Sequence, residues 1–317
     1  MKFLVIFVHR HLDFRLAELN ALLKLQSLDP LDSYDQGLWD VYAEEIKNEE
    51  PNISPVIVVD LPSFSHAKYL SKRGILIKAV YEIWGEGSSY EKLRESIKKN
   101  NIDAKAACSP ARSWKLDVVA FGRSFTMDEQ RERRLELKAV LPVQGRVEMK
   151  NPDEVFVVFE DIGITRERQE NLNPERIFLL RTVAGGFKNK RRGGARDLVD
   201  QQTLKRRQYI GPTSMDSELA LLMANMALVR DHDLVLDPFV GTGSVLISCS
   251  NFGAKCFGID IDIRVLKGKE NRDVFSNFEQ YGLPLPELLR ADNSLSPVCA
   301  GNFFDAIVCD PPVSARV

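Results

Sequence analysis

The stretch that decides the fold is Leu234-Val235-Leu236-Asp237-Pro238-Phe239-Val240-Gly241-Thr242-Gly243-Ser244-Val245-Leu246-Ile247. An apolar run, two closely spaced glycines and a second apolar run predict a strand, a tight turn and a helix. Gly241 and Gly243 permit backbone angles that other residues disfavour, and they let a ligand approach the chain closely. The helix that follows would aim its first amide groups at that ligand.

Two further strands with acidic ends follow this turn. About twenty residues later, the predicted strand at residues 255–259 ends in Asp260, and a carboxylate at that position can accept both hydroxyls of a ribose. The predicted strand at 287–291 ends at Asp292, whose side chain can bond the amino group of an adenine, or can serve only as a turn residue. This order of elements predicts a site for a nucleoside cofactor: a strand, a glycine turn, a helix and a second strand that ends in an acidic residue.

A fourth predicted strand, at residues 305–309, ends in Asp310-Pro311-Pro312. Consecutive prolines fix the backbone and remove its amide donors. The Asp310 carboxylate and the carbonyl before the prolines are therefore fixed acceptors at the carboxyl end of a strand. Two such acceptors suit an exocyclic amine, because they hold its N–H groups and leave the nitrogen lone pair facing an electrophile.

The first ninety residues have an α+β pattern. Strands and helices are expected, in chain order, at residues 3–8, 14–23, 55–60, 63–73 and 75–84, with a loop at 29–35. This β-α-β-α-β order predicts a ferredoxin-like module over residues 1–90. In the next region, residues 91–185, we expect helices at 90–99 and 127–139 and strands at 114–121, 154–160 and 177–180.

A glycine-rich basic stretch separates these regions from the glycine turn, and we interpret residues 186–212 as a basic linker. Its charged residues are Lys188, Lys190, Arg191 and Arg192, followed by Lys205-Arg206-Arg207. Contact with RNA phosphates and a merely solvated linker are both consistent with this charge. A helix is expected to start near Thr213 and Ser214, with Ser214 as its cap.

Composition excludes several classes of protein. The chain has 317 residues, 43 Lys and Arg against 45 Asp and Glu, and 44% hydrophobic residues, which is close to the globular average. No apolar run is long enough to cross a membrane. Five cysteines without CxxC spacing and four scattered histidines predict no metal site and a reducing, cytoplasmic location.

Together, Asp237 to Gly243, Gly258-Ile259-Asp260 and Asp310-Pro311-Pro312 resemble the S-adenosylmethionine-dependent amino-methyltransferases. The preceding Tyr209-Ile210-Gly211-Pro212-Thr213-Ser214-Met215 resembles the THUMP-containing tRNA guanosine-N2 methyltransferases that act on tRNA position 10. The resemblance implies an α/β chain with a ferredoxin-like module (1–90), a THUMP-like RNA-binding region (91–185), and an incomplete Rossmann-like methyltransferase domain (213–317). It also implies tRNA as substrate and a small zinc-binding activator subunit as partner.

The resemblance assigns roles to individual residues. The methionine end of the cofactor would lie against Asp237, Gly241 and Gly243, its ribose at Asp260 and its adenine at Asp292. The cofactor site would also include Thr213, Ser214 and Phe239. Asp310 and the Pro311 carbonyl, fixed by Pro312, would orient the guanine amine, and Lys188, Lys190, Arg191 and Arg192 would contact RNA.

The sequence departs from the family in two ways. Val313 stands where the family has the aromatic residue that stacks on the flipped base, a contact worth about 1–3 kcal/mol. Four strands are expected where the family has seven, in the order 3-2-1-4-5-7-6, and three more would need on the order of 80 residues. We therefore expect a truncated form, with the strand before Asp310 at a sheet edge and with impaired or no activity.

Two alternative functions stay open at this point. The first is a non-catalytic remnant that binds tRNA or a partner. The second is an amino-methyltransferase of DNA or protein, which would share the Asp-Pro-Pro chemistry.

Overall fold

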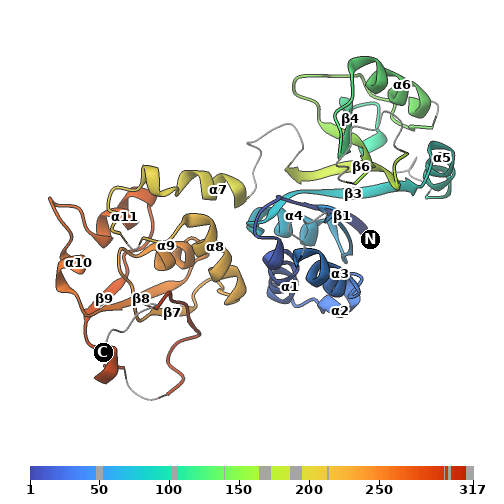
Figure 1. Ribbon diagram of the computed structural model, residues 1–317. Coiled ribbons are helices and arrows are strands. Elements are labelled where there is room, and N and C mark those ends of the chain that lie inside the picture. The colour runs from blue at the N-terminus through green and yellow to red at the C-terminus, as the bar shows by residue number, and fades with distance from the viewer. Residues whose placement is uncertain are drawn as a thin grey trace. The chain divides into compact units, whose positions relative to one another are not determined.

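A computed structural model describes residues 1–47, 53–100, 106–138, 140–163, 173–185, 195–212, 214–295, 297–298 and 301–311. The chain divides into two compact units (Figure 1). The first unit comprises Met1–Arg15, Pro30–Lys72 and Ile77–Gly194, and the second comprises Leu16–Asp29, Arg73–Leu76 and Ala195–Val317. The first unit combines helices with a mainly antiparallel sheet, and the second combines helices with a parallel sheet, which agrees with the α+β and α/β patterns that the sequence predicts for the two regions.

The first unit is built on a six-stranded sheet of order β2-β1-β3-β6-β5-β4. Its strands are β1 (Lys2–Phe7), β2 (Val56–Asp60), β3 (Ile77–Gly87), β4 (Trp114–Phe121), β5 (Glu154–Asp161) and β6 (Arg176–Gly185). Neighbouring strands are antiparallel except for the parallel pair β4–β5. The pairing of β3 with β6 joins strands from the predicted ferredoxin-like and THUMP-like regions in one sheet. The domain boundary at residue 90 stays a prediction.

Helices cover this sheet. They are α2 (Pro30–Ser33), α3 (Leu38–Ile46), α4 (Phe64–Arg73), α5 (Tyr90–Lys99) and α6 (Met127–Lys138), while α1 (Arg15–Leu25) continues into the second unit. Helix α5 packs so closely on β3 that no side chain fits at Gly85 of the strand. A Cβ atom there would lie 2.5 Å from Cγ1 of Ile97 in the helix. Leu93 of α5 and Leu137 of α6 share a core cluster with Phe156 of β5.

Buried carboxylates of the first unit are paired with arginines. Arg181 donates two hydrogen bonds, of 2.8 and 2.9 Å, to the Glu154 carboxylate. Arg133 Nε lies 2.5 Å from Glu160 Oε1, which also accepts the Tyr90 hydroxyl at 2.6 Å. A buried carboxylate needs such partners, because removal from water disfavours its charge. Loss of one of these arginines would therefore leave a buried carboxylate uncompensated and would destabilise the sheet.

The second unit contains a parallel sheet of order β10-β7-β8-β9. Its strands are β7 (Leu234–Asp237), β8 (Lys255–Asp260), β9 (Glu287–Arg290) and β10 (Ala306–Ile307). In chain order this is 4-1-2-3, which agrees with the order that the family resemblance implies. Among the described residues β10 pairs with β7 alone and lies at the sheet edge, as expected.

The other helices of this unit within its described residues are α7 (Ala195–Gln201), α8 (Ser217–Met226), α9 (Ser244–Ser250), α10 (Ile263–Lys267) and α11 (Val274–Tyr281). Val235 of β7 and Cys256 of β8 share a buried cluster with Leu246 of α9 and Phe278 of α11. Short 3-10 turns lie at Leu12–Phe14, Ala106–Cys108, Leu204–Arg206 and Asn293–Leu295.

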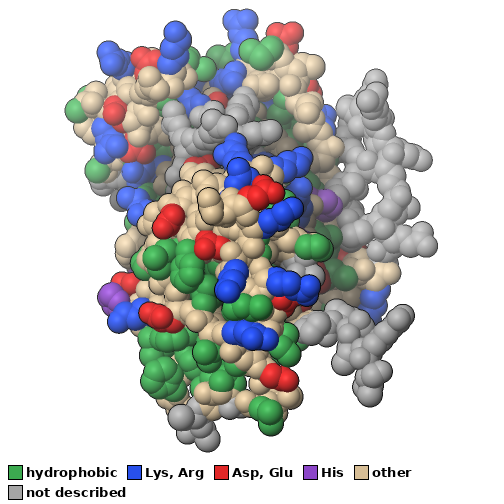
Figure 2. Space-filling model, turned by 90° about the vertical axis from the view of Figure 1, so that its left-hand side faces the viewer, with side chains coloured by type: hydrophobic (Ala, Val, Ile, Leu, Met, Phe, Trp, Pro, Cys, Tyr) green, Lys and Arg blue, Asp and Glu red, His purple; other side chains and the backbone are tan. Residues whose placement is uncertain are grey.

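The other face of the parallel sheet is exposed in part, since Leu236 and Ile259 are buried on it while its flanking residues are not. The rings of Phe257, Phe303 and Phe304 contact one another, with centroids 5.1–6.4 Å apart. Leu289 and Ile307, which the strand register places on the same side as Phe257, are 48% and 64% exposed. Figure 2 looks onto this unit and shows hydrophobic side chains gathered on the face turned to the viewer.

A fully buried carboxylate ties together the separate segments of the second unit. Glu18 accepts the backbone N–H groups of Ile75 and Leu76, at 2.7 and 2.9 Å, and the Asn225 side-chain amide at 2.8 Å. Burial raises the pKa of Glu18, and these bonds oppose the rise. Arg73 donates to Asn225 Oδ1 at 2.8 Å and lies over the Phe252 ring.

Three local expectations are corrected. Pro30–Ser33 forms a helical turn where a loop was expected, because proline is well suited to the first turn of a helix. The cap of α8 is Asp216, whose side chain accepts the N–H of Glu218, and not Ser214. The strand expected over 305–309 is limited to two residues, Ala306–Ile307, although the flanking Asp305 and Val308 N–H groups also donate to carbonyls of β7.

Candidate active site

The glycine turn has the geometry that its sequence predicts. Gly241 and Gly243 have φ values of 49° and 82°, in the left-handed region that favours glycine. At Gly243 a Cβ atom would also lie 2.8 Å from Val274 Cγ1, so the turn packs tightly against α11. The Val240 N–H donates to the Ile259 carbonyl at 2.9 Å, which fixes the turn to the end of β8. Helix α9 begins directly after Gly243.

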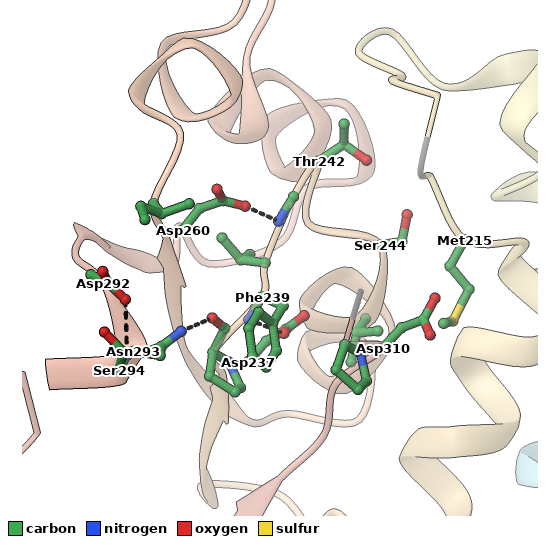
Figure 3. Close-up of a pocket in the computed structure, with 16 residues that line it drawn as sticks. Met215, Asp237, Phe239, Thr242, Ser244, Asp260, Asp292, Asn293, Ser294 and Asp310 are labelled. Carbon is green, nitrogen blue, oxygen red and sulfur yellow. Dashed lines mark hydrogen bonds between the residues drawn. The ribbon is translucent and has the colours of Figure 1, made fainter. Parts of the chain in front are cut away.

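Four carboxylates follow the carboxyl ends of the four parallel strands. Asp237 and Asp260 end β7 and β8, Asp292 follows β9, and Asp310 follows β10. Because carboxyl ends of parallel strands meet at one edge of a sheet, these side chains line one pocket. The pocket has a volume of about 950 Å³, at the upper end of the range for small-molecule sites. Figure 3 shows the four side chains around it.

Most of the predicted site residues that the structure describes line this pocket, and Ser214 and Gly243 support it from outside. The lining members of the predicted set are Asp237, Phe239, Gly241, Asp260, Asp292, Asp310 and Pro311. The predicted residues Thr213, Pro312, Lys188, Lys190, Arg191 and Arg192 lie outside the described residues. Their roles stay predictions.

Sequence reasoning missed part of the lining. The additional lining residues are Met215, Pro238, Val240, Thr242, Ser244, Val245, Ile261, Asn293 and Ser294. Those within the quoted turn could have been found from their neighbours in sequence. For Asn293, the only indication in the sequence is that it directly follows Asp292. In the structure its side-chain amide donates to the Pro238 carbonyl.

Asp237 has the most perturbed carboxyl group of the pocket. Burial raises its pKa to about 7, and the charges of Asp260 and Asp310 add to the rise, while the Phe239 N–H that it accepts at 2.9 Å opposes it. By contrast, hydrogen bonds from Ser294 lower the pKa of Asp292. The protonation of Asp237 is therefore sensitive to any charged ligand near neutral pH.

Asp260 is held in place by two backbone groups. Its Oδ2 accepts the Gly241 N–H at 3.0 Å, and its Oδ1 accepts the Asp262 N–H at 2.8 Å. A carboxylate has about four lone-pair sites, so both oxygens can still accept from a ligand. Asp310 makes no hydrogen bond with any residue that the structure describes, which leaves its carboxylate available as well.

Among the described residues, the pocket lining contains four Asp and no Lys, Arg or His. Such a pocket attracts a ligand that carries positive charge and N–H or O–H donors. S-adenosylmethionine has a sulfonium, an ammonium group, ribose hydroxyls and an adenine amine, so the residues present fit it. No group of three His, Cys, Asp or Glu residues within the described ranges could hold a metal ion.

The segment before α8 closes the pocket beside the glycine turn. Asn277 of α11 accepts the Tyr209 N–H at 2.9 Å and donates to the Tyr209 carbonyl at 2.8 Å and to the Thr242 carbonyl at 3.2 Å. The Ser214 and Thr242 hydroxyls lie 2.7 Å apart. One buried amide thus joins this segment to the turn, and places Ser214 next to the pocket wall.

Two family models match the chain. Residues 1–188 match the Tmrp11 THUMP N-terminal domain, and residues 205–317 match the RMKL-like methyltransferase domain. The chain is 32% identical over 333 residues to the human tRNA (guanine(10)-N(2))-methyltransferase TRMT11, covering 99% of this chain and 66% of the relative. It is 33% identical to the tRNA (guanine(10)-N(2))-methyltransferase of Schizosaccharomyces pombe, covering 96% of this chain and 67% of that protein.

The chain therefore spans about two thirds of the length of these curated relatives. Among solved structures, TrmN from Thermus thermophilus matches with a TM-score of 0.48 and 18% identity, covering 98% of this chain and 79% of that one. Separately, none of the helices in the described segments is long and apolar enough to span a membrane.

Proposed function

Because the chain belongs to the family that joins a Tmrp11 THUMP N-terminal domain to an RMKL-like methyltransferase domain, we propose that it methylates N2 of the guanosine at tRNA position 10, with S-adenosylmethionine as methyl donor. The observation that carries this proposal is the pocket at the carboxyl ends of β7 to β10, with its glycine turn and four carboxylates.

The cofactor would lie along this pocket. Asp292, whose Oδ1 accepts the Ser294 N–H, would also accept the adenine amine, and Phe239, which is 39% exposed, would offer an apolar surface. Asp260 would accept the ribose hydroxyls. Asp237 and the glycine turn would hold the methionine end. When bound, the cofactor supplies an electrophilic methyl group on a sulfonium.

Asp310 is the proposed catalytic residue. Its carboxylate lines the pocket without a hydrogen bond to a described residue, so it can accept an N–H of the guanine amine. With the Pro311 carbonyl as second acceptor, the nitrogen lone pair would face the methyl group. Catalysis would then rest mostly on positioning, and the guanosine would have to be flipped out of its stack.

We also propose partners and a location. Residues 1–185, with Lys188, Lys190, Arg191 and Arg192, would bind tRNA, and a small zinc-binding activator subunit would assist the catalytic domain. The protein would act in the cytoplasm. These proposals follow from the family to which the chain belongs and from the basic stretch of its sequence.

Transfer of a labelled methyl group to tRNA tests the proposal. Because impaired or no activity is expected of a chain that spans about two thirds of its curated relatives, the assay uses a form of the protein as long as those relatives, together with the activator subunit. It is incubated with a tRNA transcript that carries G10 and with a matched transcript in which G10 is replaced by A10. We expect label in the G10 transcript alone. Equal labelling of both transcripts, or label in DNA or protein instead, would contradict the proposed substrate.

A further inference from the structure

Arg207 is unusual among the basic residues near the site. Its neighbours Lys205 and Arg206 are exposed, whereas Arg207 is only 6% exposed. Its Nη1 donates to the Ser244 hydroxyl oxygen at 2.5 Å. Its Nε and Nη2 are buried and make no hydrogen bond of ordinary geometry with a described residue, although the buried Tyr281 hydroxyl interacts with the guanidinium. A buried guanidinium with two such donors is costly unless an anion is nearby.

The surroundings of Arg207 within the chain compensate its charge poorly. Burial lowers the pKa of the guanidinium, and Tyr281 and Asp216 offset only part of this effect. Asp216 is itself exposed and caps α8 through the Glu218 N–H. No carboxylate in the described segments forms an ion pair with Arg207. Its charge is therefore available to an anionic group of a ligand.

Ser244 connects Arg207 to the pocket. Its side chain lines the pocket, and its oxygen already accepts from Arg207, so the hydroxyl proton is free to be donated to a ligand. The adjacent guanidinium makes this hydroxyl a stronger donor. Figure 3 shows Ser244 and Met215 on the side of the pocket opposite Asp292, the proposed adenine end.

The remaining lining would repel an anion, because its charged residues are all Asp. A ligand with one carboxylate is therefore oriented, with the carboxylate at Ser244 and its positive groups toward Asp237 and Asp310. The methionine moiety of S-adenosylmethionine has this distribution of charge, and its carboxylate is the one anionic group of the cofactor.

We propose that Arg207 is a positioning residue for the carboxylate of the cofactor's methionine moiety and acts through the Ser244 hydroxyl. This proposal rests on the proposed function, because it takes S-adenosylmethionine as the ligand of the pocket.

Calorimetry with two ligands tests it. S-adenosylmethionine and decarboxylated S-adenosylmethionine differ only in the carboxylate, and each is titrated into wild-type chain, Arg207→Met, Arg207→Lys and Ser244→Ala. Arg206→Met, an exposed neighbour, is the matched control. We expect Arg207→Met and Ser244→Ala to weaken binding of S-adenosylmethionine about tenfold or more, with binding of the decarboxylated ligand changed less than about twofold. Arg207→Lys should recover most of the loss.

Equal losses for both ligands would overturn the proposal, because a purely structural brace would affect them alike. Unchanged binding of S-adenosylmethionine to Arg207→Met and Ser244→Ala would also overturn it. If Arg207→Met does not fold, the Ser244→Ala variant tests the proposal alone, through the same comparison of its affinities for the two ligands. Binding of neither ligand to folded wild-type chain would instead contradict the proposed function, and with it the ligand named here.

Discussion

Both sheets of the molecule carry carboxylates, but these carboxylates have different partners. In the first unit, Glu154 and Glu160 are buried and paired with Arg181 and Arg133. In the second unit, the four Asp residues at the strand ends line a pocket and form no ion pair with a described residue. Carboxylates whose charge is compensated within the chain stabilise the fold, whereas uncompensated ones in a pocket are available to a ligand. The acidic residues that the fold pairs with arginines therefore differ from the acidic residues that we propose bind a ligand.

The largest effect is expected from Asp310→Ala. If this carboxylate holds the guanine amine, its loss should lower the rate of methyl transfer to tRNA by about 10²–10⁴-fold, with cofactor affinity almost unchanged. Glu287→Ala, at the opposite end of the same sheet, is the control and should keep full activity. A wild-type rate for Asp310→Ala would remove this residue from the mechanism.

Breaking a pair in the first unit should affect stability instead. Arg181→Met removes this arginine from Glu82 and leaves Glu154 paired with Arg112, and we expect a loss of about 1–3 kcal/mol in the free energy of unfolding, measured in urea. This expected loss is smaller than for a fully buried ion pair, because the Arg181 side chain is 22% exposed and water screens its charge. Lys2→Met, which breaks an exposed pair with Glu86, should cost less than about 1 kcal/mol. Similar losses in both variants would contradict the structural role.

Asp260→Ala should weaken binding of S-adenosylmethionine about tenfold to a hundredfold, because hydrogen bonds to a charged group contribute about 1.5–3 kcal/mol. Asp262→Ala is the matched control. Asp262 lies two residues further along and caps α10 outside the pocket lining. Calorimetry with both variants measures the difference, and equal affinities would argue against a ribose contact at Asp260.

The smallest effect concerns pH. The Asp237 carboxyl, with a pKa raised to about 7, is mostly protonated at pH 6 and mostly ionised at pH 8. A cationic ligand favours the ionised form, so affinity for S-adenosylmethionine should rise about tenfold from pH 6 to pH 8, and binding near pH 7 should release a proton. Asp237→Asn should abolish this dependence. An affinity that falls with rising pH would reverse the assigned sign.

Much of the second unit could be predicted because its signals are local. Asp260 ends β8 where expected, since an apolar run, a glycine turn and an acidic strand end are all encoded within a few residues. The helix at residues 90–99 was likewise predicted with the bounds of α5, whose cap Ser89 is adjacent in sequence. The pairing of β3 with β6 joins strands that are far apart in the sequence. No short stretch of sequence indicates which strands pair, so this pairing could not be predicted.

The site shows the same limit. Ser214 and Asp216 are both good helix caps, and only the fold decides that Asp216 caps α8 while Ser214 contacts Thr242. Arg207 belongs to a run of three basic residues that the sequence presents as one solvated stretch. Its burial beside Ser244 becomes visible only when the segment before α8 is placed against α9 and α11.

Calorimetric titration of S-adenosylmethionine into the purified 317-residue chain tests the central claim most directly. The account predicts one site per chain with micromolar affinity, and loss of that binding in Asp260→Ala. No binding to a chain whose circular dichroism shows it folded would contradict the assignment of the acidic pocket to this cofactor.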